Sequence, residues 1–360
     1  MKSKIASLVL LAVLIVTSGF TQPAAPAAGG ITVTDALGRT VTLPKTPSRI
    51  VISGKALIMV ADAIYVFPEA GKNIAAIGST AQGASDFIPM IDPTFKDKTM
   101  LENNAGAEQI AAVKPDCAIL KSSVKSSLGD PLEQLGIPVI YVDFETPDQY
   151  ARDMKTLGQI FQNPDRATQV MEYFTGKADT IKKAVSTLKD DQKPKTLILY
   201  YSSKEGNVSF NVPPMGWMQT LMVEMAGGTP VWKDANPGKG WTTVSMEQVA
   251  AWNPDYIFVV AYSKPATEAV KSMKEDAQWK ELKAVKENKL FAFATDVYSW
   301  DQPDTRWTLG LQWMASTLHP DLFKDWDITK AAKEFYKELY GMDDSSFEKN
   351  IAPLLVEEVK

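Results

Sequence analysis

The residues best suited to holding a small molecule are hydroxyl and lysine side chains that directly follow short apolar stretches. Ligands of open α/β sheets bind beyond the carboxyl ends of the strands, so we expect these groups to line one cleft. Arg306 would add a further cation, and Asp301 either lines the cleft or fixes Arg306 through an ion pair. Such positive charge favours an anionic ligand; the alternative is that the lysines are solvated turn residues. The groups are Ser53 and Lys55, Lys121 and Ser122, Tyr201, Ser202 and Lys204, and Tyr262 and Lys264.

Aromatic residues gather in the second half of the chain. Tryptophan and tyrosine can cover a flat, partly apolar molecule while their polar edges orient it. We expect Trp241 and Trp300 to face the cleft, with Trp217 as a further candidate. Trp232 and Trp307 are expected in the core. The full set is Trp217, Trp232, Trp241, Tyr298, Trp300 and Trp307.

The histidine and cysteine content argues against a naked metal ion as ligand. A transition metal would need a cluster of His, Cys and carboxylate side chains, yet the chain has one His, His319, and one Cys, Cys117. We therefore predict no metal site and no cofactor, and a metal, if bound, arrives already wrapped in an organic chelator. Met218, Met222 and Met225 are interpreted as core residues rather than a copper site.

Composition and the N-terminus predict that the protein is exported from the cytoplasm. Lys2 and Lys4 precede the apolar run from Ile5 to Val16, which predicts that residues 1–30 are a secretory signal peptide and a small-residue linker. The alternative is an uncleaved membrane anchor. Loss of this segment would change the net charge from −5 to −7, so nucleic acid is not an expected partner. With a single cysteine, no internal disulfide can form.

Strand-like and helix-like stretches alternate along the chain, which predicts an α/β fold with mostly parallel sheets. Residues 31–43 read as a β-hairpin. Asn163 as N-cap and Pro164 at the first helical position begin a long amphipathic pattern. We predict an N-terminal lobe at 31–162, one rigid connecting helix at 163–190 and a C-terminal lobe at 191–360. The alternative is that the helix merely covers a sheet.

A repeated nine-residue phrase supports this two-lobe layout. It occurs at 108–116 as EQIAAVKPD and at 247–255 as EQVAAWNPD, with six identical positions. An offset of 139 residues is too long for a solenoid repeat, whose units span roughly 20–50 residues. Each copy predicts a short helix that ends before its proline and leads into a buried strand. Two similar lobes would enclose a ligand cleft between them.

These features together resemble one protein family. The phrase in each lobe, the opening stretch from Asp35 to Val51 and the late stretch from Trp300 to Gly310 are similar to periplasmic substrate-binding proteins of ABC importers. The resemblance is to the class that handles ferric siderophores, haem and cobalamin. It implies two α/β/α lobes joined by one rigid helix, a ligand held between them and an importer permease dimer as partner. The protein itself is expected to be a monomer.

The same resemblance implies roles for two glutamates. Glu108 and Glu247 match positions that dock onto arginines of the permease in this family. Their alternative role is local, because an acidic residue in the first turn of a helix is favoured by the helix dipole. Phe20 stands where many relatives carry a lipid-anchor cysteine, so we expect no lipid anchor.

Three other functions fit the sequence less well. A binding protein for a molybdate- or tungstate-type oxyanion would suit the serine and lysine groups but not the aromatic excess. An exported α/β enzyme is disfavoured because no G-x-S-x-G phrase occurs and the single His lies in a predicted turn. A surface adhesion module is disfavoured because the chain lacks tandem small domains.

Overall fold

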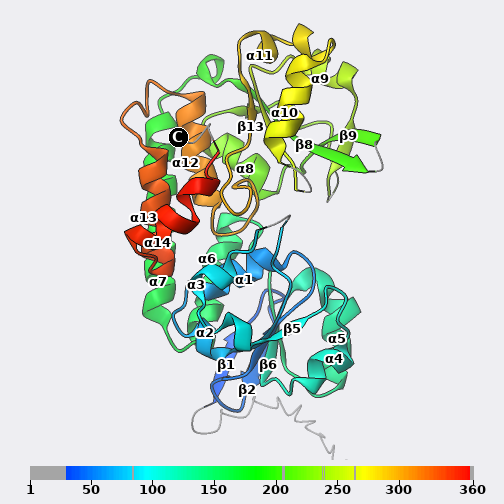
Figure 1. Ribbon diagram of the computed structural model, residues 1–360, viewed down its shortest axis with the longest axis vertical. Helices are drawn as coiled ribbons and strands as arrows, with labels where there is room; N and C mark the ends of the chain where they lie inside the picture. Colours follow the sequence, from blue (N-terminus) through cyan, green and yellow to red (C-terminus); the bar gives the residue numbers. More distant parts are fainter. Residues whose placement is uncertain are drawn as a thin grey trace, which may run out of the picture.

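Two β-sheets, one in each half of the chain, form the frame of the molecule (Figure 1). The computed structural model describes residues 30–82, 85–204, 207–236, 238, 240–262 and 265–356. The predicted signal peptide and linker therefore lie outside the described residues, apart from Gly30. Strands β1 (Ile31–Thr34) and β2 (Thr40–Leu43) pair antiparallel, which confirms the hairpin expected at 31–43.

The N-terminal sheet is parallel throughout, in the order β5-β4-β3-β6-β7. Every residue of β6 is buried, as expected for a parallel strand covered on both faces. Together with the hairpin and its helices, this sheet forms what we call the N-terminal lobe. Its strands are β3 (Ile50–Ile52), β4 (Ile74–Gly78), β5 (Thr99–Leu101), β6 (Cys117–Lys121) and β7 (Val139–Val142). Its helices are α1 (Leu57–Tyr65), α2 (Ala70–Asn73), α3 (Ile88–Ile91), α4 (Ala107–Ala112), α5 (Asp130–Gln134) and α6 (Pro147–Ile160).

The C-terminal sheet is mixed, with a parallel centre and an antiparallel edge. Parallel pairs join β10 to β8, β8 to β12 and β12 to β13. Strand β9 pairs antiparallel with β8 on one side and with β11 on the other. We call this sheet and its helices the C-terminal lobe. Its strands are β8 (Lys195–Lys204), β9 (Asn207–Val212), β10 (Thr229–Pro230), β11 (Thr242–Val244), β12 (Tyr256–Val260) and β13 (Leu290–Ala292). Its helices are α8 (Met218–Met225), α9 (Met246–Trp252), α10 (Ala266–Glu275), α11 (Lys283–Lys286), α12 (Trp307–Leu318), α13 (Ile328–Tyr340) and α14 (Asp344–Asn350).

One long helix, α7 (Pro164–Val185), runs along one side of the molecule past both lobes (Figure 1). Asn163 is its N-cap, accepting the backbone N–H of Arg166 at 3.1 Å, as the sequence predicts. The helix has 22 residues and ends at Val185, before the predicted end at 190. Ser186 turns back to donate to the carbonyl of Lys183 at 2.7 Å, a bond that competes with helix continuation.

The hydrophobic core is shared between the lobes. A single buried cluster extends from Ile52 of β3 through Phe174 of α7 to Ile198 of β8. The C-terminal helices strengthen this link, because α13 lies beside α7 (Figure 1) and Arg166 donates to the carbonyls of Glu338 and Leu339 at 2.9 and 2.8 Å. The molecule is thus an α/β protein of two similar lobes joined by α7. Within the described ranges, no helix combines the length and apolar character needed to span a membrane.

Candidate functional site

Four aromatic side chains at the carboxyl end of the C-terminal sheet pack together while staying partly exposed. The ring centre of Tyr200 in β8 lies 5.0 Å from the ring centre of Trp241 and 4.9 Å from that of Tyr262. Trp217, directly before α8, contacts Trp241 edge-on at 5.7 Å. Strand β12 ends at Val260, the partner of Tyr200 in the sheet, so the rings lie where ligands of such sheets bind. We call Tyr200, Trp217, Trp241 and Tyr262 the aromatic cluster.

A fully buried carboxylate, Asp301, holds this cluster from the protein interior. The hydroxyl of Tyr262 donates to it at 2.6 Å and the side-chain amide of Gln219 at 3.2 Å. The hydroxyl of Ser299 donates to the second carboxylate oxygen at 2.6 Å. Burial raises the pKa of Asp301 to about 6, although the three donors oppose the shift. Asp301 therefore positions Tyr262, rather than fixing Arg306 as one of our two alternatives had it.

Asp301→Asn is expected to remove one pH-dependent contribution to stability. The pKa of Asp301 is raised to about 6 in the folded protein. Between about pH 4 and pH 6, the Asp301 carboxyl is therefore protonated to a greater extent in the folded protein than in the unfolded chain. The contribution is complete below this window and is lost as the pH rises through 6. The wild type should therefore lose stability relative to the variant as the pH rises. Urea unfolding from about pH 4 to about pH 7 measures this, and a difference independent of pH would contradict it.

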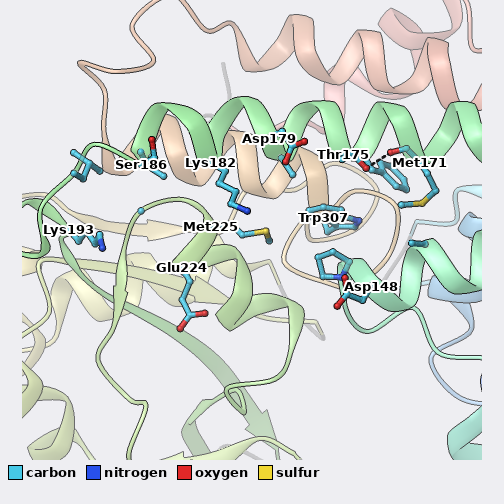
Figure 2. A pocket seen from close by; sticks show the side chains of 17 residues that line it. Asp148, Met171, Thr175, Asp179, Lys182, Ser186, Lys193, Glu224, Met225 and Trp307 are labelled. Atoms are coloured by element: carbon cyan, nitrogen blue, oxygen red, sulfur yellow. Dashed lines mark hydrogen bonds between the residues drawn. The ribbon is translucent and has the colours of Figure 1, made fainter.

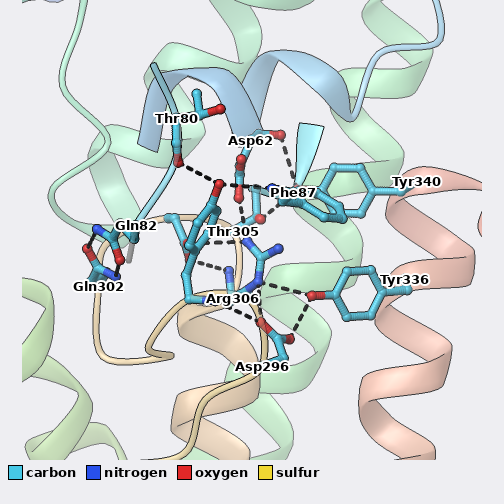
Figure 3. Close-up of polar contacts among 12 residues, drawn as sticks. Asp62, Thr80, Gln82, Phe87, Asp296, Gln302, Thr305, Arg306, Tyr336 and Tyr340 are labelled. Atoms are coloured by element: carbon cyan, nitrogen blue, oxygen red, sulfur yellow. Dashed lines mark hydrogen bonds and ion pairs between the residues drawn. The ribbon is translucent and has the colours of Figure 1, made fainter. Parts of the chain in front are cut away.

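The segment that carries Asp301 also reaches the N-terminal lobe. Gln302 and Gln82 exchange side-chain amide hydrogen bonds of 2.9 and 3.0 Å across the seam between the lobes (Figure 3). The hydroxyl of Tyr298 donates to the carbonyl of Thr80 at 2.7 Å. We call residues 295–306 the bridging segment. It places the aromatic cluster at the border between the two lobes.

The structure corrects the prediction for Tyr201 and Ser202. Strand β8 continues to Lys204 and pairs with β9, so these residues lie within a strand and not beyond its end. Neighbouring residues of a strand point to opposite faces. Tyr201 accordingly packs on Phe210 at 6.0 Å, while Tyr200 joins the aromatic cluster. Tyr201 was predicted from the sequence because the strand was expected to end there, and the neighbouring Tyr200 was not predicted.

The predicted site residues of the N-terminal lobe differ in burial and in whether another side chain pairs with them. Lys121 is buried and forms an ion pair with Glu145, and the hydroxyl of Ser122 donates to Asp143. Ser53 is buried directly after β3. Lys55 is exposed, and no hydrogen bond or ion pair joins its side chain to another described residue. The side chain of Lys204 and residue Lys264 lie outside the described part of the chain.

Arg306 and Trp300 do not have the exposure that we predicted. Arg306 is fully buried and forms ion pairs with Asp62, Asp296 and Asp304 (Figure 3), so its charge is not free to meet an anionic ligand. Trp300 is also fully buried. Its carbonyl packs so closely on α12 that a Cβ on Gly310 would lie 2.3 Å from it. Sequence alone could not separate these buried roles from cleft roles, because Trp and Arg suit both.

Comparison with known proteins places the chain in a family. The sequence model of a family described as periplasmic binding protein matches residues 93–296, which are 204 of the 360 residues. The chain belongs to the periplasmic binding protein family. This confirms the predicted resemblance to substrate-binding proteins of ABC importers.

Individual relatives are distant, and the share of the chain that they cover differs from one to the next. The molybdate-binding protein MolA of Haemophilus influenzae is 22% identical over 86% of this chain and 90% of its own length. A vitamin B12-binding protein of Yersinia pestis is 30% identical over 42% of this chain and 51% of its own. A periplasmic solute binding protein from Veillonella parvula, a solved structure, has a TM-score of 0.70 with 25% identity and covers 89% of this chain and 97% of its own.

The repeated phrase forms the same structure in both lobes of this periplasmic binding protein: a short helix, α4 or α9, and the turn that leads into the next strand. We call this structure the corner. The glutamine of each copy folds back onto the residue before its helix: Gln109 accepts the N–H of Gly106 at 3.0 Å, and Gln248 accepts that of Ser245 at 2.9 Å. The final aspartate then ties the corner to the neighbouring strand. Asp116 accepts the backbone N–H of Arg49, and Asp255 that of Lys195, at 3.0 and 2.9 Å.

Because the two corners match, Glu108 and Glu247 occupy the same place in each lobe. Each is the second residue of its short helix, α4 or α9, and each is exposed. A hydrogen bond with Ser245 lowers the pKa of Glu247 below its usual value. Both side chains are therefore available to a partner that binds the two lobes at once.

A large cavity among the described residues lies away from the aromatic cluster. It measures about 710 Å³ and lies between α6, α7 and α8, with Met171, Met225 and Trp307 among its lining residues (Figure 2). In the described ranges, no group of three or more His, Cys, Asp or Glu side chains is placed to hold a metal ion. His319 instead packs at the end of α12, with Nε2 3.1 Å from the carbonyl of Gly227.

Proposed function

We propose that this periplasmic binding protein captures a metal chelate of the ferric siderophore, haem or corrinoid type and delivers it to an ABC importer. The observation that carries the proposal is the aromatic cluster. Its four rings stay partly exposed at the border between the lobes, although exposed aromatic surface is unfavourable in water. A ligand with a flat, partly apolar face would cover these rings and gain from the contact.

The charges near the seam support a chelate over a small free anion. Lys121 and Arg306, two of the predicted cleft cations, are neutralised by carboxylates. Lys55 is exposed and unpaired among the described residues. A chelate with a few carboxylate or phenolate groups needs only such limited positive charge, since apolar contact supplies much of its binding energy.

An oxyanion of the molybdate type is the second candidate. Helix α1 begins at Leu57 without a side-chain cap, and Ser53 and Lys55 lie in the short turn that joins it to β3. Free N–H groups at a helix start can bind an anion. MolA, named as a molybdate-binding protein, covers most of this chain at 22% identity, which supports the same alternative.

Delivery is proposed to use the two matched glutamates. We propose that Glu108 and Glu247 contact cationic residues of the permease dimer, one from each lobe. Paired charges at the rim of an interface orient the partners and raise the association rate. We further propose export by the N-terminal signal peptide without a lipid anchor, and action as a monomer.

The ligand carried by protein purified from its native host distinguishes the two candidates. For a metal chelate, we expect a visible absorption band and an organic molecule in native mass spectra, in a fixed ratio to iron or cobalt. Colourless protein that contains molybdenum or tungsten and no organic ligand would instead establish the oxyanion. Protein produced without the host's ligands is the control for adventitious metal.

A further inference from the structure

The seam between the lobes contains a fully buried charge cluster centred on Arg306 (Figure 3). Two of its carboxylates come from the bridging segment itself: Asp296 at 2.9 Å from Nε and Asp304 at 3.2 Å from Nη1. The third, Asp62, lies on α1 of the N-terminal lobe and pairs with Nη1. Arg306 thus joins carboxylates from both lobes through one planar group, which a lysine cannot do with the same geometry.

Aromatic rings from both lobes enclose the same guanidinium. Its carbon lies 4.5 Å from the ring centre of Phe87 in the N-terminal lobe and 4.9 Å from that of Tyr298 in the bridging segment. The hydroxyl of Tyr298 accepts the backbone N–H of Phe87 at 3.1 Å. The hydroxyl of Tyr340 in α13 donates to the carbonyl of Asp62 at 3.1 Å. Arg306 is therefore fixed relative to both lobes by stacking as well as by charge.

The cluster has too many carboxylates to be explained by stability alone. Burial raises the pKa of Asp62 to about 6 and that of Asp304 well above its ordinary value, despite the neighbouring Arg306. Buried ion pairs often contribute no more to stability than apolar side chains of similar size. What this arrangement does supply is a single relative position of the lobes, because only one position brings Asp62 to the Arg306–Asp296–Asp304 group.

We propose that Arg306 is a positioning residue that sets the orientation of the two lobes by holding Asp62 across the seam. The bridging segment then acts as a second connection besides α7. It fixes the border on which the aromatic cluster lies and the spacing of Glu108 and Glu247. The use of that spacing rests on the proposed function, but the orientation itself is a property of the ligand-free protein.

Distances between spin labels on the two lobes of ligand-free protein test the proposal. Cysteines at Leu135 and Leu322, which are 49% and 44% exposed in the N- and C-terminal lobes, carry the labels. Cys117 is fully buried and stays unlabelled. In Arg306→Met, Asp62 faces Asp296 and Asp304 without a counterion, so we expect a broader distribution shifted to longer distances. Arg306→Lys keeps the charge but not the planar contacts, so we expect a smaller change; it also serves if Arg306→Met does not fold.

A second substitution separates positioning from general loss of packing. Among the described residues, Asp62 is the sole carboxylate that the N-terminal lobe contributes to the ion pairs of Arg306. Adding Asp62→Asn to Arg306→Met removes it, so the distribution should narrow again. Adding Asp304→Asn instead is the matched control and should not narrow it, because Asp62 still faces Asp296. Wild-type distances in both Arg306 variants, or equal narrowing by the two second substitutions, would overturn the proposal. Because no ligand is present, neither result depends on the ligand that the protein carries.

Discussion

Replacing Glu108 and Glu247 together with alanine is expected to reduce uptake strongly while leaving ligand affinity unchanged. Both side chains are exposed, and they lie on the repeated corners rather than in the aromatic cluster. Each rim charge pair with the permease contributes roughly 1 kcal/mol, so loss of both should weaken docking by roughly thirtyfold. Transport of ligand into proteoliposomes that hold the permease, alongside titration calorimetry, measures the two quantities separately.

A matched control removes the same charge from elsewhere on each lobe. Asp148 in α6 and Glu268 in α10 are also exposed acidic residues in the first turns of helices, but they lie outside the repeated phrase. Asp148→Ala with Glu268→Ala should therefore leave uptake near the wild-type rate. Equal loss of uptake in both double variants would show that net charge matters and not the corners. Loss of ligand affinity in Glu108→Ala with Glu247→Ala would likewise count against a docking role.

Tyr200→Ala is expected to lose most ligand affinity, whereas Tyr201→Ala is expected to keep it. The two residues are neighbours of the same type in β8, but only Tyr200 packs in the aromatic cluster, against Trp241 and Tyr262. Tyr201 packs on Phe210 instead. Truncating an aromatic anchor at the centre of a binding site costs roughly 2 kcal/mol or more, which lowers affinity by roughly thirtyfold.

Tryptophan fluorescence titration of ligand-stripped protein measures both affinities. Urea unfolding of the same variants shows whether either substitution also lowers stability, since both remove a ring from the same strand. Wild-type affinity in Tyr200→Ala, or an equal loss in Tyr201→Ala, would exclude the aromatic cluster as the binding surface. Titration with molybdate in parallel extends the comparison to the second candidate.

The two-lobe fold was predictable largely because one short sequence phrase occurs in each lobe and forms the same local structure there. In each copy, glutamine caps the helix start and aspartate ties the corner to the neighbouring strand. These are local bonds, so their residue types could be recognised without knowledge of the rest of the chain. The N-cap of α7 at Asn163 was predictable for the same reason.

The composition of the site was less predictable, because it depends on contacts between distant residues. Arg306 was expected to be a free cation, yet its partner Asp62 is 244 residues away in the sequence. Lys121 is likewise neutralised by Glu145, which follows a different strand. The choice between Tyr200 and Tyr201 depended on where β8 ends, and the β9 partner that extends it was not recognised.

Hydrogen–deuterium exchange of the protein with and without its native ligand tests most directly where the ligand lies. We predict protection in peptides that contain Tyr200, Trp217, Trp241 and the bridging segment, together with the turn after β3 in the opposite lobe. Protection confined to the cavity between α6, α7 and α8, with unchanged exchange around the aromatic cluster, would contradict ligand capture between the lobes.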